Sequence, residues 1–349
     1  MENNIYSVGA GKSNAYLIMD EKIVIVDGVT ADSADKYIEN IKNLTDKADY
    51  VIFNNTCPNH SGSFKKLLEA FPGIEVIASV AGIRSLKEIA NCDFREHLAK
   101  DGAELNIGNK PLKFLITPNL PSPDSMMTYM DGILFSGNAF SSENENFTSI
   151  EEYYEDKLSS FAPFVKTMTE RIKTMDIRAI YPAEGRVLTE LTANAVELYG
   201  KLSRPSDKSK TVILYCSNYG ATREMAETIS GVLENAECID LMKTADISET
   251  INSAKALIIG TPTVNKNAPK EIWNALSEID LITMKGTPYF VFGSYGWSGD
   301  AVQLVSNYMK LLRLKQFDKP FGVLFNMSDS EREELITYTR KFMEETNEI

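Results

Sequence analysis

The chain has few of the residues that bind metals or form disulfides. Its 349 residues include only two histidines, His60 and His97, and four cysteines, no two of which form a C-x-x-C pair. This pattern excludes a zinc-ribbon or rubredoxin-like module and gives no disulfide framework. The sequence also lacks an apolar run long enough to span a membrane, and its start lacks the basic and hydrophobic regions of a signal peptide. We therefore expect a cytoplasmic protein with no membrane partner.

Positive charge is scarce as well. Lys and Arg total 36 against 49 Asp and Glu, which gives a net charge of −13. An acidic surface repels polyanions, so we expect no nucleic acid partner. The length predicts two domains, and the polar, proline-containing stretch 203–210 resembles a linker. We place an N-terminal domain at 1–203, a linker at 204–210 and a C-terminal domain at 211–349.

The C-terminal half alternates regularly between two kinds of segment. Short apolar runs predict strands, and amphipathic runs between them predict helices. The strands are expected at 211–215, 238–241, 256–260, 288–292 and 321–325, and the helices at 222–233, 247–254, 269–279, 300–312 and 330–345. This alternation predicts a doubly wound parallel sheet of the α/β class. Ligands of such sheets bind beyond the carboxyl ends of the strands.

Three loops follow expected strands at that edge: 217–222 (the first loop), 261–265 (the second loop) and 293–299 (the third loop). Hydroxyls and backbone N–H groups at a helix start suit a phosphate, glycines admit a close ligand, and aromatic rings suit a flat one. Because no G-x-G-x-x-G follows a strand, a dinucleotide is disfavoured, and the three loops together predict FMN. The predicted FMN-binding residues are Ser217, Asn218, Tyr219, Gly220, Ala221, Thr222, Pro262, Thr263, Asn265, Ser294, Tyr295, Gly296, Trp297 and Gly299.

The N-terminal half has more strands and fewer helices. Its pattern predicts an α+β or αββα sandwich. Strands are expected at 14–19, 23–27, 50–54, 75–78, 112–117, 128–135 and 177–181, and helices at 32–44, 64–71, 81–89 and 150–175. His97 lies in a run that looks helical, where we expect an ordinary surface residue.

At the polar loop 54–63 the chain resembles the flavodiiron proteins, or A-type flavoproteins. The resemblance covers nearly the whole chain. It includes the three loops, 14–18 (Asn-Ala-Tyr-Leu-Ile), 60–62 (His-Ser-Gly), 123–126 (Pro-Asp-Ser-Met) and 134–136 (Leu-Phe-Ser). It implies a metallo-β-lactamase-like αββα domain followed by a flavodoxin-like domain with FMN. It also implies a head-to-tail homodimer, in which electrons pass from a donor through FMN to a diiron centre that reduces dioxygen or nitric oxide. The sequence does not identify the donor protein or reductase.

The diiron ligands of the family are largely missing. Where the family carries H-x-E-x-D-H, this chain has Asn55-Thr56-Cys57-Pro58-Asn59-His60. The three remaining ligand positions hold Pro121, Asn138 and Glu184, so six of the seven positions depart from the pattern. Asparagine is a weak neutral donor and proline offers no ligand, so we expect no metal here. Without a cation, buried carboxylates in this pocket would repel one another, and asparagines at 59 and 138 remove that charge. We expect His60 and Glu184 to pair across the pocket.

The resulting prediction is an FMN-binding flavoprotein without a diiron centre, which transfers electrons or uses its flavin on an unidentified acceptor. The chemistry would sit at the flavin ring, held by Tyr295, Trp297 and the loop amides, and no side chain is singled out as catalytic. Three alternatives stay open. They are a redox sensor without turnover, an enzyme with one metal held by Cys57, His60 and Glu184, and the oxygen or nitric oxide reductase that the family suggests.

Overall fold

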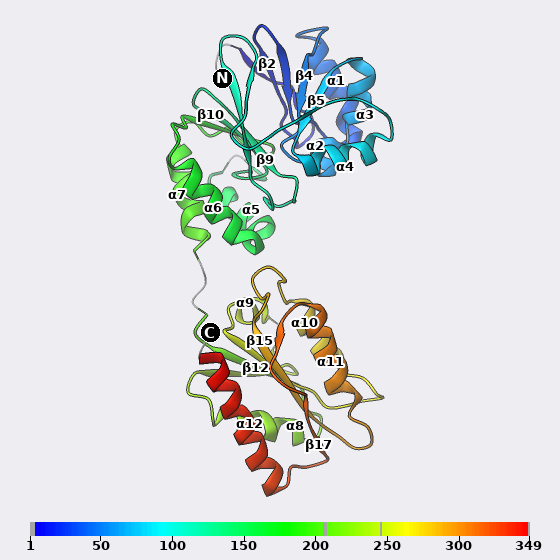
Figure 1. Cartoon of the computed structure of the whole chain (residues 1–349), viewed down its shortest axis with the longest axis vertical. Coiled ribbons are helices and arrows are strands. Elements are labelled where there is room, and N and C mark those ends of the chain that lie inside the picture. Colours follow the sequence, from blue (N-terminus) through cyan, green and yellow to red (C-terminus); the bar gives the residue numbers. More distant parts are fainter. Residues whose placement is uncertain (1–3, 145, 205–207, 245, 348–349) are drawn as a thin grey trace. The chain divides into compact units, whose positions relative to one another are not determined.

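The computed structural model describes residues 4–144, 146–204, 208–244 and 246–347 (Figure 1). The chain divides into two compact units, Met1–Pro205 (the N-terminal unit) and Ser206–Ile349 (the C-terminal unit). This division falls inside the stretch interpreted as a linker. None of the helices in the described ranges combines the length and the apolar character that crossing a bilayer requires.

The N-terminal unit is a sandwich of two sheets with helices outside both. One sheet has the order β1-β2-β3-β4-β5-β6 and the other β11-β10-β9-β8-β7. The strands are β1 Ile5–Ser7, β2 Tyr16–Met19, β3 Ile23–Val26, β4 Tyr50–Ile52, β5 Glu75–Ala78, β6 Arg95–Leu98, β7 Glu104–Asn106, β8 Pro111–Ile116, β9 Met126–Met130, β10 Ile133–Gly137 and β11 Ala179–Pro182. The helices are η1 Ala31–Ser33, α1 Ala34–Lys42, α2 Pro58–Ser61, α3 Phe64–Ala70, α4 Val80–Ala90, α5 Thr148–Lys157, η2 Ser159–Phe161, α6 Ala162–Ile172 and α7 Thr192–Leu202.

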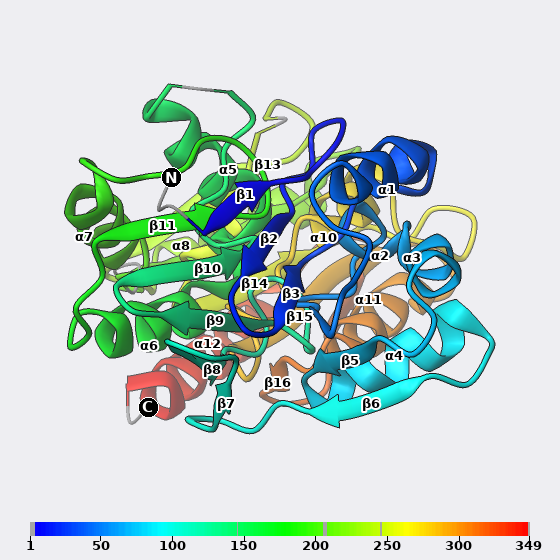
Figure 2. The same cartoon turned by 90° about the horizontal axis from the view of Figure 1, so that it is seen from above.

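Alternation along the strands divides this unit into three apolar layers. On β3, Ile25 packs with α1, α3 and α4, whereas Val24 and Val26 face the opposite sheet. This is the two-residue period of a strand that is buried on both faces. The second sheet is covered in the same way by α5, α6 and α7. Figure 2 shows the two groups of helices at opposite sides of the sandwich, so the predicted αββα architecture is confirmed.

The C-terminal unit is a parallel sheet of order β13-β12-β14-β15-β16, with β17 also paired to β15. Its strands are β12 Thr211–Tyr215, β13 Ala236–Asp240, β14 Ala256–Gly260, β15 Pro288–Tyr295, β16 Lys315–Gln316 and β17 Phe321–Leu324, and its helices are α8 Ala221–Ser230, α9 Ser248–Asn252, α10 Lys270–Ser277, α11 Asp300–Leu311 and α12 Asp329–Asn347. The strand order reverses between β12 and β14, and apolar clusters fill both faces of the sheet. The predicted doubly wound sheet is confirmed, and its switch point lies where the first and second loops begin.

Three sequence expectations for the N-terminal half were wrong. The single strand at 128–135 is a hairpin, β9 and β10, which turns at Asp131 and Gly132, both with positive φ. The helix at 150–175 is two helices separated by η2, because Pro163 sits in the first turn of α6, where proline starts a helix. His97 lies on the edge strand β6 rather than on a helix, although its side chain is partly exposed at the surface, as expected.

Candidate functional site

The first loop joins β12 to α8. The Ser217 hydroxyl accepts hydrogen bonds from the backbone N–H groups of Gly220, at 3.1 Å, and Arg223, at 3.2 Å. Gly220 has φ +97°, a conformation that glycine adopts without steric cost. The loop is thereby folded over the start of a ten-residue helix, where the backbone dipoles favour an anion such as a phosphate.

Hydrogen bonds join the third loop to both the first and the second loop. The hydroxyls of Thr222 and Ser294 lie 2.9 Å apart and are buried. The Thr263 N–H donates to the Ser294 carbonyl at 3.2 Å, and the Thr263 hydroxyl accepts from the Ala301 N–H at 3.3 Å. The structure therefore brings the three predicted loops together at the carboxyl ends of β12, β14 and β15.

Close packing of β14 and β15 at this edge depends on Gly293. A Cβ placed on Gly293 would lie 1.9 Å from the Thr261 carbonyl oxygen, far inside contact distance. The glycine lets the second and third loops leave the sheet side by side. Glycine is therefore required at position 293 because the neighbouring backbone leaves no room for a Cβ atom, and not because the chain must be flexible there.

Two aromatic side chains of the loops are almost fully exposed to solvent. Tyr219 is 100% exposed and Trp297 is 98% exposed. The ring of Tyr295, in contrast, packs against Gly299 and Gly322, where added Cβ atoms would lie 2.9 and 3.1 Å from its Cε1. Tyr219 and Trp297 are thus the rings available to cover a flat ligand, and Tyr295 is partly covered by its own unit.

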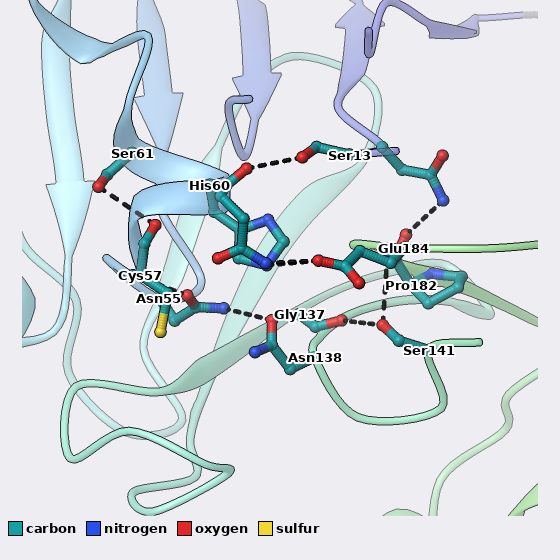
Figure 3. A network of polar contacts seen from close by, with 12 residues as sticks. Ser13, Asn55, Cys57, His60, Ser61, Gly137, Asn138, Ser141, Pro182 and Glu184 are labelled. Carbon is teal, nitrogen blue, oxygen red and sulfur yellow. Dashed lines mark hydrogen bonds and ion pairs between the residues drawn. The ribbon is translucent and has the colours of Figure 1, made fainter. Parts of the chain in front are cut away.

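A network of polar side chains in the N-terminal unit lies around α2 (Figure 3). Asn55, before α2, donates from its side-chain amide to the Asn138 Oδ1 at 2.9 Å, after β10. Both side chains are buried. These two asparagines occupy positions where the resemblance implies metal ligands, and here the two amides bind each other.

His60 and Glu184 lie next to each other but share no hydrogen bond. The His60 Nε2 is 3.9 Å from the Glu184 Oε1, and that carboxylate oxygen accepts from the Asn59 amide instead. The expected pairing is therefore present as a contact and not as a hydrogen bond, because the nearer Asn59 amide satisfies the carboxylate oxygen. Burial lowers the pKa of His60 from 6.5 to about 4, so the imidazole is neutral at neutral pH.

The donors in this network do not fit a diiron centre. Within the described residues, no three His, Cys, Asp or Glu side chains come close enough together to hold a metal ion. Burial raises the pKa values of both Cys57 and Glu184, which disfavours the charged forms that ligate metals. The Cys57 sulfur also points away from the Glu184 carboxylate (Figure 3).

Comparisons with known proteins agree on both units. A family described as flavodoxin matches residues 213–337, and one described as ODP family beta lactamase matches residues 12–185. Flavo-diiron protein FprA2 of Clostridium acetobutylicum is 37% identical over 94% of this chain and 90% of that protein. This chain belongs to the flavodiiron protein family. Its flavodoxin domain, with the three loops assembled at the switch point, indicates FMN as the cofactor.

Other relatives and solved structures support the same membership. A nitric oxide reductase of Moorella thermoacetica is 26% identical over 88% of this chain and 84% of that protein. The structure of a flavoprotein from Thermotoga maritima has a TM-score of 0.63 at 26% identity and covers 94% of this chain and 89% of its own. Rubredoxin oxygen:oxidoreductase from Desulfovibrio gigas shares the fold, with a TM-score of 0.68 at 21% identity over 99% and 98% of the two chains.

Proposed function

We propose that this flavodiiron family member is an FMN-dependent electron-transfer flavoprotein that works without a diiron centre. The observation that carries the proposal is the hydrogen bond between Asn55 and Asn138, which uses two family ligand positions to satisfy each other. Pro121 offers no ligand at a third position, and the neutral imidazole of His60 is left with too few anionic neighbours to offset the charge of two irons.

The C-terminal unit supplies the residues that would hold FMN. The first loop and the start of α8 would receive the phosphate through hydroxyls and backbone N–H groups, and residues 217–222 include no lysine or arginine. Tyr219 and Trp297 would cover the ring, and the backbone of the third loop would orient it. When bound, the flavin supplies one- and two-electron redox chemistry. The protein determines its position, its exposure and its access to partners.

The family resemblance also supports a head-to-tail homodimer that is reduced by an unidentified donor protein or reductase. We place the protein in the cytoplasm. Support comes from its cysteines, all four of which are free thiols, as expected in a reducing compartment. Sedimentation of the purified protein tests the dimer, since a monomer at micromolar concentration would contradict it.

The deciding experiment is metal analysis together with an absorption spectrum, on protein purified without chelators from iron-supplied cells. We expect a flavin spectrum with about one FMN per chain, and iron and zinc far below one per chain. Two irons per chain would refute the proposal and restore an oxygen or nitric oxide reductase, and one stoichiometric zinc would favour a single-metal enzyme. Stopped-flow reoxidation then separates a carrier, which responds to added acceptors, from a sensor, which does not.

The Asn138→Asp variant provides a matched control for this measurement. If this polar network holds no cation, a new buried carboxylate carries a desolvation cost, and the N-terminal unit becomes less stable. If a cation does bind there, the same substitution adds an anionic ligand and increases both metal content and stability. The two alternatives therefore predict opposite effects of the substitution on the unfolding midpoint when iron or zinc is present.

A further inference from the structure

Phe325 has a backbone conformation that its residue type disfavours. It directly follows β17 and has φ +58°. A bulky side chain in the left-handed region is a steric outlier, because Cβ crowds the backbone there. The sequence predicts Phe325 only as the end of a strand, outside the three loops.

Packing of the C-terminal unit does not account for this conformation. The Phe325 side chain is 64% exposed, so burial of its ring recovers little of the steric cost. Leu324, the preceding residue, is also exposed at 53%. A conformation whose free-energy cost the surrounding core does not offset is a reason to look for a function.

The contacts of Phe325 place its ring and its backbone against the third loop. Its N–H donates to the Tyr295 carbonyl at 2.9 Å, which continues the pairing of β17 with β15 for one more residue. Its ring lies on Gly296, where an added Cβ would be 3.3 Å from the Phe325 Cε1. The left-handed turn thus places an aromatic ring on the glycine between Tyr295 and Trp297.

We propose that Phe325 is a further aromatic residue of the flavin site, which contacts the FMN ring beside Gly296 and contributes to its affinity. This inference rests on FMN binding by the C-terminal unit. A planar heteroaromatic ligand held by the third loop would bury the exposed face of Phe325, and aromatic contacts of this kind are favourable beyond the area that they cover. The backbone strain is then offset in the loaded protein rather than in the apoprotein.

Glycine substitution separates the ring from the strain. Phe325→Gly removes the ring and relieves the positive φ, whereas Phe325→Ala removes the ring and keeps the strain. Arg313→Gly is the matched control, because Arg313 has φ +62° in the same unit, in the turn before β16. Phe325→Tyr tests rescue by a second flat ring.

The measurements are FMN titration of each full-length apoprotein by flavin fluorescence, thermal unfolding of the apoprotein, and sedimentation. We expect the Kd for FMN to rise about tenfold in Phe325→Gly and Phe325→Ala and to stay near the unsubstituted value in Phe325→Tyr and Arg313→Gly. The apoprotein Tm should not fall in either glycine variant.

An unchanged Kd in both ring-deletion variants would overturn the inference. If self-association were lost as well, Phe325 would be assigned to an interface between chains. A full-length protein without substitutions that fails to bind FMN would instead refute the proposed function itself, so the two failures are distinguishable.

Discussion

Two buried ionisable groups of the N-terminal unit should give its stability opposite dependences on pH. Asp27, at the end of β3, is 1% exposed and accepts hydrogen bonds from the Asn54 N–H at 2.7 Å and the Asn54 amide at 2.9 Å. Burial raises the pKa of Asp27 from 3.8 to about 6, in spite of these bonds. Burial lowers the pKa of His60 from 6.5 to about 4. Burial therefore favours the neutral form of both groups.

The signs follow from which state binds more protons. Folded Asp27 binds a proton more readily than unfolded Asp27, so its contribution to stability is present below pH 4 and is lost as the pH rises to 6. Folded His60 binds a proton less readily, so its contribution is present above pH 6.5 and is lost as the pH falls to 4. Each shift is roughly two pKa units, or about 3 kcal/mol. Between pH 4 and 6 the two effects nearly cancel.

Single substitutions should reveal each slope. Relative to the unsubstituted chain, Asp27→Asn is expected to gain about 3 kcal/mol of stability as the pH rises from 4 to 6. His60→Gln is expected to gain a similar amount as the pH falls from 6.5 to 4. In Asp27→Asn, the Asn54 amide can flip and still bond both its neighbours, because the Thr128 hydroxyl that donates to it can also accept.

Hydrogen exchange of peptides from β2 to β4, corrected for intrinsic rates, measures the opening free energy of this unit alone. Both tryptophans, Trp273 and Trp297, lie in the C-terminal unit, so their fluorescence during urea unfolding provides an internal control that should not change with either substitution. The reasoning is refuted if the two variants shift in the same direction with pH, or if neither differs in slope from the unsubstituted chain.

Two further substitutions test the packing. Gly293→Ala should force β14 and β15 apart, because its Cβ would meet the Thr261 carbonyl oxygen. We expect the C-terminal unit to lose about 3 kcal/mol of stability in tryptophan-detected urea unfolding, and FMN binding to weaken in flavin titration. Tyr199→Phe should cost the N-terminal unit about 1–3 kcal/mol in urea unfolding, because the Tyr199 hydroxyl accepts from the buried Phe140 N–H at 2.9 Å; no loss of stability would mean that this N–H finds another acceptor.

The parts of the fold that could be predicted are those with local signals. The strands at 75–78, 211–215 and 256–260 match the structure to the residue, because each is a short run of mainly apolar residues. The hairpin of β9 and β10 was missed although Asp131 and Gly132 are typical turn residues, because the apolar flanks suggested one continuous strand. On β6 the polar residues gave no apolar alternation, since this edge strand is largely exposed.

The candidate site divides in the same way. Glycines and hydroxyls directly after apolar strands are local patterns, so the three loops could be located in advance. The partner of Asn55 lies 83 residues away and is determined by how two sheets pack, which no local pattern reports. The strain at Phe325 was equally hidden, because phenylalanine at a strand end gives no sign of a positive φ.

The amide hydrogen bond between Asn55 and Asn138 has a consequence for how the N-terminal unit depends on its surroundings. A metal that joins two loops adds to stability in proportion to the logarithm of its free concentration, so such a protein weakens when the metal is withdrawn. Two side chains of the same chain have a fixed effective concentration. The junction between the α2 loop and the end of β10 should therefore form equally well in iron-starved and iron-replete cells, and folding of this unit would be independent of iron supply.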